Sequence, residues 1–490
     1  MEKELEGSIL TGFDLWEWCD ENHFEVSGNA DARSLKFARV STDTRSIQTG
    51  DLFVALVGER FDAHDFLRGA WESGAKAAIV SRPRASLQNV PDEMILIHVQ
   101  DTLAALQMLA TSLWREMIVS RDVITVSLTG SNGKTTSKEL LRALFSVRHA
   151  HVYATHGNFN NHIGVPLTIC AIPLRAEVVI LEMGASKRGD IDELTAIAPA
   201  RARLITSIGH AHLEGMGGLD GVRLTKREIF HGHDAHTIAV VPKSEQANLI
   251  TSDYQGVVKS FCEGCDEANV STHIIEEEAD GTLVEVRCAR LDAPVRFKLP
   301  LLGAHHVSNI AGCLAIASEL GEAIDEEWLR KAMEKLHIPG GRSEVVELGG
   351  YRILNDSYNA NPTSMLASFE AFLSWSVHQR GEGDELIAII GEMAEVGQDS
   401  KNWHEQIACR MVEVEREDPR QHLTALICVG RHAQGMKQAT SAIATSVEVV
   451  ACEDLEEVAR WLTKHERGVI FLKASRSARL ERLMEIIQDG

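Results

Sequence analysis

The segment from Thr129 to Thr136 reads Thr-Gly-Ser-Asn-Gly-Lys-Thr-Thr, and its residue types suit the binding of a phosphorylated nucleotide. Its glycines let the backbone curl so that several N–H groups face one anion. Lys134 can then reach the terminal phosphates, and the Thr135 hydroxyl can ligate magnesium. The alternative is a glycine turn that carries a surface lysine. We predict an ATP site with Mg²⁺ that includes the whole loop: Thr129, Gly130, Ser131, Asn132, Gly133, Lys134, Thr135 and Thr136.

A second candidate for this chemistry is Glu182, which directly follows the apolar run of residues 178–181. A carboxylate at the tip of a parallel strand projects toward a phosphate site in the same sheet, and carboxylate oxygens are ligands that magnesium prefers. The alternative is an ordinary acid at the end of a strand. We predict that Glu182 holds magnesium.

A sheet is needed to position these residues, and the surrounding sequence indicates one. Residues 123–128 form a β-branched run of strand length that enters the glycine loop, and residues 135–147 have a helical pattern. Further strand candidates at 177–181 and 204–208 are separated by helix-length segments. This order predicts an α/β fold with a mainly parallel sheet and helices on both of its faces.

The chain of 490 residues is long enough for three domains, with two as the alternative. Upstream of the glycine loop, strand candidates at 52–57 and 77–80 flank a helical stretch at 66–73 and indicate a small α/β domain. Downstream, strands expected at 386–390, 425–429, 447–450 and 469–472 alternate with helices and predict a Rossmann-like domain. The predicted domains are an N-terminal domain at 1–118, a central P-loop domain at 119–336 and a C-terminal domain at 337–490.

The bulk composition excludes several functions. A formal net charge of -22 argues against a nucleic-acid or anionic-membrane partner, because both would repel the protein. The N-terminus lacks the basic and apolar segments of a signal peptide, and no run of about 18 apolar residues follows, so we expect a cytoplasmic protein. As a separate expectation, we take the protein to be a monomer. Nine scattered cysteines predict reduced thiols without disulfides, and we interpret the Cys262/Cys265 pair as a surface turn, not half of a zinc site.

The glycine loop resembles the phosphate loop of the Mur ligase family, and the resemblance extends from about residue 41 to residue 477. It rests on several further motifs that occur in the family's order. These are Glu-Met-Gly-Ala at 182–185, His-Ala-His-Leu-Glu-Gly at 210–215, Gly-Ala-His-His-Val-Ser-Asn at 303–309, Gly-Gly-Arg at 340–342, Asn-Asp-Ser-Tyr-Asn-Ala-Asn-Pro at 355–362 and Lys-Ala-Ser-Arg-Ser at 473–477.

This resemblance implies an ATP-dependent ligase of peptidoglycan precursors. Its N-terminal domain would hold the UDP end of a UDP-muramyl peptide, its central domain ATP, and its C-terminal domain the incoming amine. ATP would phosphorylate the terminal carboxylate, and the amine would then displace phosphate from the acyl phosphate. Because this step brings two anions together, the site needs concentrated positive charge. Arg342 resembles the family arginine that reaches the γ-phosphate when the domains close.

The resemblance also assigns roles that the bare sequence would not. His212 matches a metal-ligating histidine, although magnesium rarely takes histidine and a structural histidine is otherwise the better interpretation. Lys226 falls where many Mur ligases carry a lysine carbamylated by carbon dioxide, whereas the sequence alone favours a solvated helix lysine. Asn309 matches the asparagine that contacts adenine, and we add Asp356 and Tyr358 to the nucleotide site. His306 departs from the family's Gly-x-His-Asn pattern and leaves that part of the adenine contact open.

The substrate preference depends on motifs at both ends of the chain. Asp43-Thr44-Arg45 resembles the UDP-binding start of the members that form tripeptides and pentapeptides. The runs at 160–166 and 358–362 resemble the members that add D-alanyl-D-alanine to UDP-N-acetylmuramoyl-tripeptide, although His162 replaces a glutamate often found there. One alternative is a diaminopimelate- or lysine-adding ligase. The run at 417–420 is close to a motif of the diaminopimelate-adding members, but we interpret this likeness as coincidence. The alternative from another class is a P-loop kinase or nucleotide switch. The expected substrate-binding residues are Asp43, Thr44, Arg45, Asn160, Asn161, Asn359, Asn361, Ser475 and Arg476.

Overall fold

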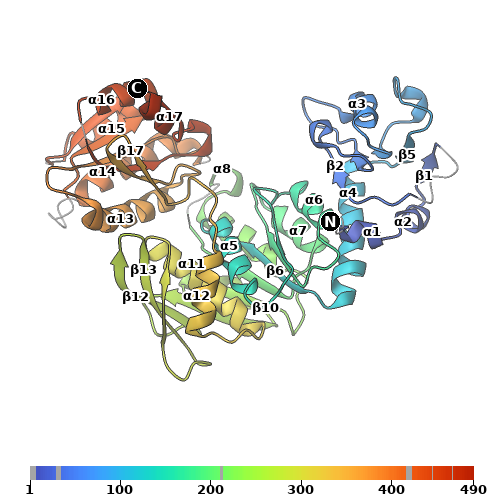
Figure 1. The fold of residues 1–490 in the computed structure, drawn as a ribbon, viewed down its shortest axis with the longest axis horizontal. Coiled ribbons are helices and arrows are strands. Elements are labelled where there is room, and N and C mark those ends of the chain that lie inside the picture. The colour runs from blue at the N-terminus through green and yellow to red at the C-terminus, as the bar shows by residue number, and fades with distance from the viewer. Residues whose placement is uncertain are drawn as a thin grey trace, which may run out of the picture.

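The computed structural model describes residues 7–28, 35–209, 213–394, 396–414, 422–443, 445–465 and 467–489. These residues form three α/β units, each built around its own sheet, of five, nine and six strands. The N-terminal and C-terminal units lie on either side of the central unit (Figure 1). The prediction of three α/β units with mainly parallel sheets is confirmed.

The N-terminal unit has the strand order β1-β5-β4-β3-β2, in which β2 to β5 run parallel and β1 is antiparallel to β5. The predicted strand at 52–57 is shorter than expected, because the chain leaves the sheet after Val54 and Val57 is exposed. The elements are α1 (Ile9–Gly12), α2 (Leu15–Glu21), β1 (Glu25–Ser27), β2 (Val40–Ser41), β3 (Leu52–Val54), α3 (Leu67–Glu72), β4 (Ala77–Val80), β5 (Ile95–His98) and α4 (Thr102–Leu113).

Helix α4 connects this unit to the next one. It continues into a π-helical turn, Trp114–Ile118, and a 3-10 turn, Val119–Arg121, and it ends at Asp122 in the left-handed conformation with φ 54°. Its buried face joins one hydrophobic cluster with side chains of the central unit, such as Val165 and Ile169. The predicted boundary at 118/119 therefore falls inside a continuous helical stretch and stays a prediction, as does the boundary at 336/337.

The central unit is built on a nine-stranded sheet of order β14-β13-β12-β11-β10-β9-β6-β8-β7. Strands β6 to β12 run parallel, whereas β12, β13 and β14 form an antiparallel meander that the sequence did not reveal. The strands are β6 (Ile124–Thr129), β7 (Val152–Ala154), β8 (Val178–Glu182), β9 (Ala202–Ile205), β10 (Ile238–Pro242), β11 (Val257–Glu263), β12 (Val270–Glu278), β13 (Gly281–Cys288) and β14 (Val295–Leu299). The helices are α5 (Lys134–Phe145), α6 (Gly164–Cys170), α7 (Asp190–Ile197), α8 (Leu213–Met216), α9 (Leu219–Arg227), α10 (Glu245–Thr251), α11 (Ala304–Glu319) and α12 (Glu326–Lys335).

The C-terminal unit has the strand order β15-β16-β20-β17-β18-β19, with every pair parallel except β15 and β16. The order reverses between β17 and β20, which is the place where open α/β sheets form a ligand crevice beyond the carboxyl ends of their strands. The elements are β15 (Glu344–Leu348), β16 (Tyr351–Asn355), α13 (Pro362–Gln379), β17 (Glu385–Ile390), α14 (Ser400–Val414), β18 (Ala425–Val429), α15 (Ala433–Thr440), β19 (Glu448–Cys452), α16 (Leu455–Leu462), β20 (Gly468–Lys473) and α17 (Arg482–Asp489).

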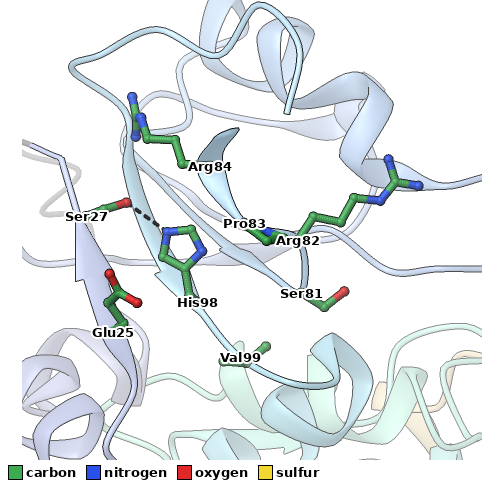
Figure 2. Close-up of a pocket in the computed structure, with 8 residues that line it drawn as sticks. All are labelled: Glu25, Ser27, Ser81, Arg82, Pro83, Arg84, His98 and Val99. Atoms are coloured by element: carbon green, nitrogen blue, oxygen red, sulfur yellow. Dashed lines mark hydrogen bonds between the residues drawn. The ribbon is translucent and has the colours of Figure 1, made fainter. Parts of the chain in front are cut away.

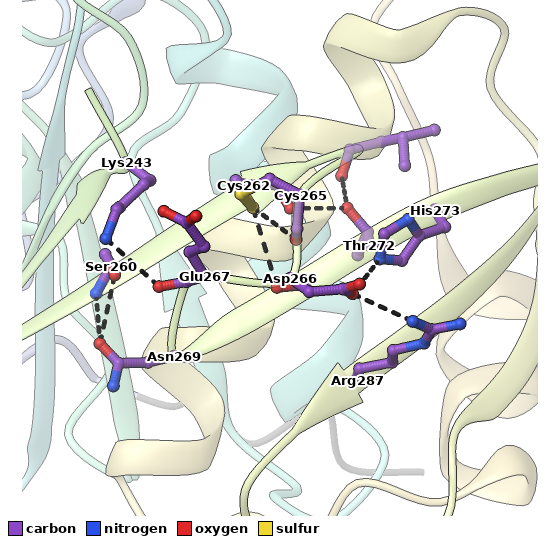
Figure 3. Close-up of a disulfide and its surroundings, with 12 residues drawn as sticks. Lys243, Ser260, Cys262, Cys265, Asp266, Glu267, Asn269, Thr272, His273 and Arg287 are labelled. Carbon is purple, nitrogen blue, oxygen red and sulfur yellow. Dashed lines mark hydrogen bonds and ion pairs between the residues drawn. A yellow bond between two sulfur atoms is a disulfide. The ribbon is translucent and has the colours of Figure 1, made fainter.

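The expectation that all cysteines are reduced is wrong for one pair. Cys262 and Cys265 form a disulfide at the turn that follows β11 (Figure 3). Gly264, with φ +72°, folds the chain back and brings the two Cα atoms to 5.9 Å, which is within the range of disulfides. The segment is a surface turn as expected, but its thiols are joined. Among the described residues no group of three or more His, Cys, Asp or Glu side chains is arranged to hold a metal.

Within the described ranges, no helix is long and apolar enough to cross a membrane.

Candidate active site

The phosphate loop connects the carboxyl end of β6 to the start of α5, as the strand and helix patterns predicted. Two of its glycines have no room for a side chain. A Cβ on Gly130 would lie 2.0 Å from the Thr206 hydroxyl oxygen, and one on Gly133 would lie 2.2 Å from Asn309 Oδ1. Both glycines also have positive φ angles, +159° and +80°. Only glycine fits both positions, because an added Cβ would clash and Gly133 is in the left-handed region.

The loop is held in place by the end of the neighbouring strand β9. The Ser131 N–H donates to the Ser207 carbonyl oxygen at 3.0 Å, and the Ser131 hydroxyl donates to the Gly209 carbonyl oxygen at 2.9 Å. Lys134 is the first residue of α5, and its Nζ donates to the Gly130 carbonyl oxygen at 2.8 Å. The lysine head thus lies over the loop at a helix N-terminus, where backbone N–H groups and the helix dipole favour an anion.

Glu182 lies at the tip of β8, next to the phosphate-loop strand β6, and is only 2% exposed. Its Oε1 accepts a hydrogen bond from Asn160 Nδ2 at 2.8 Å, and its backbone N–H donates to the Thr155 hydroxyl at 2.9 Å. Its other carboxylate oxygen, Oε2, is buried and has no hydrogen-bond partner among the described residues. A buried, unpaired carboxylate oxygen is costly unless a proton or a cation satisfies it.

Lys226 lies on α9 and is fully buried, at 0% exposure, so the alternative of a solvated helix lysine is wrong. Its Nζ has no hydrogen-bond partner among the described residues. Burial lowers the pKa of this ammonium well below its ordinary value, and the nearby charge of Lys134 lowers it further against the opposing charges of Glu228 and Asp190. This lowered pKa favours the uncharged amine. The predicted metal ligand His212 lies outside the described residues.

Arg342 comes from the loop before β15 and reaches the central unit. Its Nη2 donates to Thr135 Oγ1 at 3.2 Å, and its guanidinium lies 3.5 Å from the centroid of the Tyr358 ring. Such a cation–π contact orients the planar head of the arginine. Burial lowers the pKa of Arg342, but its ordinary value is so high that the head stays charged. The C-terminal unit thus places a fixed positive charge at the phosphate loop.

Asp356, predicted in the nucleotide site, lies at the end of β16 and connects three elements. Its carboxylate pairs with Lys473 and accepts hydrogen bonds from the Ser368 hydroxyl at 2.6 Å and the Ser343 N–H at 3.1 Å. Lys473 is 2% exposed and was not among the predicted site residues. It ends the apolar run of β20 in the way that Glu182 ends β8, so the same strand-end signal could have identified it.

The amide side chains of Asn132 and Asn361 meet across the boundary between the central and C-terminal units. Asn361 Nδ2 donates to Asn132 Oδ1 at 2.6 Å, and Asn132 Nδ2 lies 3.4 Å from Asn361 Oδ1. Asn361 is also the N-cap of α13, because its Oδ1 accepts from the Ser364 N–H at 2.8 Å. The predicted substrate residue Asn361 is therefore tied to the phosphate loop itself.

The other predicted substrate residues of these two units have varied surroundings. Ser475 Oγ accepts from the Ala394 N–H at 2.6 Å, beyond the carboxyl ends of β17 and β20. Arg476 pairs with Glu481. Asn161 Oδ1 accepts from the Gly164 N–H at 2.8 Å, at the first residue of α6, and the Asn359 carbonyl oxygen accepts from Lys473.

Asp43, Thr44 and Arg45 lie in the N-terminal unit, in the turn after β2. Hydrogen bonds from Arg45 lower the pKa of Asp43 to about 2, and the Arg45 side chain is 88% exposed. The structure does not bring these residues to the phosphate loop, because they belong to a separate sheet. Arg45 is nevertheless open to an incoming anion.

A cavity of about 310 Å³ in the N-terminal unit lies beside β1 at the ends of β4 and β5 (Figure 2). Ser27 Oγ lies 2.8 Å from His98 Nε2 at its wall, and no pattern in the sequence pointed to either residue. The two arginine heads turn away from it, because Arg82 pairs with Asp62 and Arg84 donates to the Pro91 carbonyl oxygen. Its residues are Glu25, Ser27, Ser81, Arg82, Pro83, Arg84, His98 and Val99.

The sequence was compared with protein families and with curated proteins. Residues 36–113 match the profile described as Mur ligase family, catalytic domain, residues 128–317 the Mur ligase middle domain, and residues 341–476 the Mur ligase glutamate ligase domain. The chain is 32% identical to the UDP-N-acetylmuramoyl-tripeptide–D-alanyl-D-alanine ligase of Bacillus subtilis (strain 168), over 92% of each protein.

Solved structures agree with these matches. MurF from Acinetobacter baumannii superposes with a TM-score of 0.81 at 27% identity, covering 93% of this chain and 94% of that one. MurF ligase from Thermotoga maritima in complex with ADP superposes with a TM-score of 0.75 at 28% identity, covering 92% and 97%. Residues 417–420, which are close to a motif of the diaminopimelate-adding ligases, lie outside the described residues. This chain therefore belongs to the Mur ligase family.

Proposed function

We propose that this protein is an ATP-dependent ligase that adds D-alanyl-D-alanine to UDP-N-acetylmuramoyl-tripeptide. The products are ADP, phosphate and the pentapeptide precursor of peptidoglycan. The names of relatives that match along nearly the whole chain support the substrates. The observation that carries the reaction type is the contact of Arg342, from the C-terminal unit, with Thr135 of the phosphate loop. A kinase or nucleotide switch would not need a third unit to complete its phosphate site.

The charge arrangement explains how this chain would promote the first step. The terminal carboxylate of the tripeptide must approach the γ-phosphate of ATP, and the two anions repel each other. Lys134 and Arg342 converge on the phosphate loop from two units and offset this repulsion. The acyl phosphate formed there is then attacked by the amino group of the dipeptide, and phosphate leaves. We assign Asn309, which lies against Gly133, to the adenine end of ATP.

The described residues also fit magnesium. Thr135 offers a hydroxyl oxygen at the start of α5, and Glu182 offers the buried Oε2 that has no partner among the described residues. Hard oxygen ligands of this kind suit Mg²⁺, which also keeps waters and phosphate oxygens as ligands. When bound, the ion would neutralise charge on the phosphates. Asn160 holds Glu182 by its other oxygen, so the free oxygen is kept in one orientation.

A carbamate on Lys226 fits the same surroundings. Only an uncharged amine attacks carbon dioxide, and the lowered pKa of Lys226 favours that form. The full burial of an unpaired Nζ is hard to explain as a stabilising feature of the fold. Carbamylation would convert the amine into an anion, and this would suit a residue that shares a site with magnesium.

The remaining assignments concern the substrates and the state of the protein. We place the UDP end at the turn of Asp43 to Arg45 and the dipeptide at the crevice that contains Ser475. We propose a monomer, because residues of a single chain meet at the phosphate loop. We further propose that the enzyme works in the cytoplasm, where ATP is supplied.

The test of this function is a product assay. The enzyme is incubated with ATP, Mg²⁺ and UDP-N-acetylmuramoyl-tripeptide, with D-alanyl-D-alanine, diaminopimelate or lysine as the second substrate, and the products are weighed by mass spectrometry. Pentapeptide formed only with the dipeptide, and phosphate release that requires both peptide substrates, is the expected result. The Lys134→Ala variant should be inactive. Rapid ATP turnover without the dipeptide, or product only with a single amino acid, contradicts the proposal.

A further inference from the structure

His306 lies in the first turn of α11 and forms a contact that crosses to the C-terminal unit. Its ring is 4% exposed, and its Nε2 lies 3.0 Å from the Ser343 hydroxyl oxygen. The neighbouring His305 ring packs against it with a centroid distance of 4.0 Å. Ser343 directly follows Arg342 in the chain. A side chain of the central unit is thus bonded one residue away from the arginine that meets the phosphate loop.

Ser343 has a backbone conformation that needs support. Its φ is +51°, in the left-handed region that non-glycine residues rarely adopt. Its N–H donates to Asp356 Oδ1 at 3.1 Å, so both polar groups of this residue that face the site have partners. The left-handed turn at Ser343 redirects the chain immediately after Arg342. The direction in which Arg342 leaves the backbone is therefore linked to the bonds that hold Ser343.

The other bonds of this loop come from the C-terminal unit itself. The Tyr358 N–H donates to the Gly341 carbonyl oxygen at 2.9 Å, and the Gly341 N–H donates to Glu344 Oε2 at 2.9 Å. The His306 bond differs from these because its partner belongs to the central unit, on the helix that also carries Asn309. It fixes the loop relative to the nucleotide-binding unit and not only relative to its own sheet.

We propose that His306 is a positioning residue that holds Ser343 and thereby orients Arg342 toward the γ-phosphate of ATP. The role of Arg342 rests on the proposed function. Burial lowers the pKa of His306 well below its ordinary value, and the nearby His305 and Lys473 add to this, so the ring is neutral. A neutral ring can accept the hydroxyl proton at Nε2. That nitrogen is engaged with Ser343 and is not free to bind adenine.

Three variants and a pair of nucleotides test this proposal. His306→Phe keeps a ring against His305 but removes the acceptor, Ser343→Ala removes the hydroxyl, and the third variant combines the two. The dissociation constants of ADP and of a non-hydrolysable ATP analogue are measured for each variant, together with kcat for pentapeptide formation. Thermal unfolding shows whether each variant is folded.

The expected pattern follows from the γ-phosphate, which only the ATP analogue carries. Each single variant should lower kcat by up to about 10²-fold, which is the cost of misplacing a catalytic group by about 1 Å. Each should also weaken the binding of the ATP analogue more than the binding of ADP. The double variant should be no worse than either single one, because both changes break the same bond. His306→Gln, whose amide group reaches about as far from the backbone as Nε2 and can accept from or donate to the Ser343 hydroxyl, should restore most of the loss.

The outcomes that overturn the proposal differ from those that overturn the function. His306 contacts the base instead if His306→Phe weakens the binding of ADP as much as the binding of the ATP analogue. The same conclusion follows if His306→Phe changes the preference for ATP over GTP and Ser343→Ala does not. If the fold-loss of kcat in the double variant equals the product of the two single losses, the two residues act independently. If the wild-type enzyme makes no pentapeptide, the proposed function fails, whereas the ratio of analogue to ADP affinities still decides the role of His306.

Discussion

Arg342 Nη2 donates to Thr135 Oγ1 across the boundary between the C-terminal and central units, at 3.2 Å. The same guanidinium lies 3.5 Å from the centre of the Tyr358 ring, which leaves it little freedom to turn. Thr135 follows Lys134, so two cationic side chains lie at one helix N-terminus although they are 208 positions apart in the sequence, at 134 and 342. The nucleotide site that we propose would therefore be complete only when both units are in contact.

This geometry predicts that Arg342→Lys is a severe change. A lysine keeps the charge but cannot lie flat on Tyr358 and donate sideways to the phosphate site at the same time. We expect kcat for ligation to fall by about 10² to 10³-fold, the usual cost of removing one donor to developing charge, with little change in ADP affinity. Steady-state kinetics and ADP titration measure both. Arg330→Lys, on the exposed face of α12, is the matched control, and a similar loss there would refute the prediction.

The burial of Lys226 predicts a stability that depends on pH. Between its lowered folded pKa and its unfolded pKa of about 10.4, the unfolded chain binds a proton that the folded chain lacks. This group therefore destabilises the fold at neutral pH, and its penalty disappears as the pH rises toward 10.4. We expect Lys226→Met to have a higher Tm than the wild type at pH 7 in bicarbonate-free buffer, by a margin that shrinks toward pH 10. Lys331→Met, at an exposed ion pair, should show no such trend. A constant margin would argue against a neutral buried amine.

The proposed carbamate leads to a chemical prediction at the same residue. Lys226→Ala removes the side chain and leaves a cavity beside the phosphate site, so ligation should be lost. Short carboxylates such as acetate or formate can enter that cavity and replace the carbamate anion, and we expect partial recovery of kcat at high concentrations of these ions. Sodium chloride at equal ionic strength is the control. Absence of recovery would count against the carbamate, but not against ligation, which the product assay tests separately.

The phosphate loop could be located from sequence because strand, glycines, lysine and helix are neighbours in the chain. Glu182 was found because a single acid ends an apolar strand. Burial of Lys226 was not evident from its polar surroundings, since helix α9 buries that position against elements distant in sequence. The contact of Arg342 was expected only from the family resemblance, because the residues around position 342 do not show that this arginine lies close to Thr135.

Other features depend on pairings that only the tertiary structure shows. The Cys262–Cys265 disulfide was missed because the prediction rested on the number and scatter of the cysteines. The disulfide instead depends on the left-handed conformation of Gly264, which brings the two thiols together. The antiparallel meander of β12 to β14 was missed because acidic residues end β12 at Glu276 to Glu278 and obscure its strand pattern. The hydrogen bond between Asn361 and Asn132 joins two loops. It could not be predicted, because the sequence of a loop does not show which other loop it contacts.

That amide pair gives a prediction that separates helix capping from domain contact. Asn361→Ala should remove the N-cap of α13, costing about 0.5–2 kcal/mol of stability, and also the bond to Asn132. Ser364→Ala removes the reciprocal half of the capping box but leaves the Asn132 bond intact. We therefore expect both variants to lower the Tm and only Asn361→Ala to lower kcat. Asn361→Ser sharpens the comparison, because serine caps a helix as well as asparagine but its shorter side chain does not reach Asn132. It should keep its Tm and lose activity, whereas full activity would show that the bond between the two units does not help to hold the phosphate loop for the reaction.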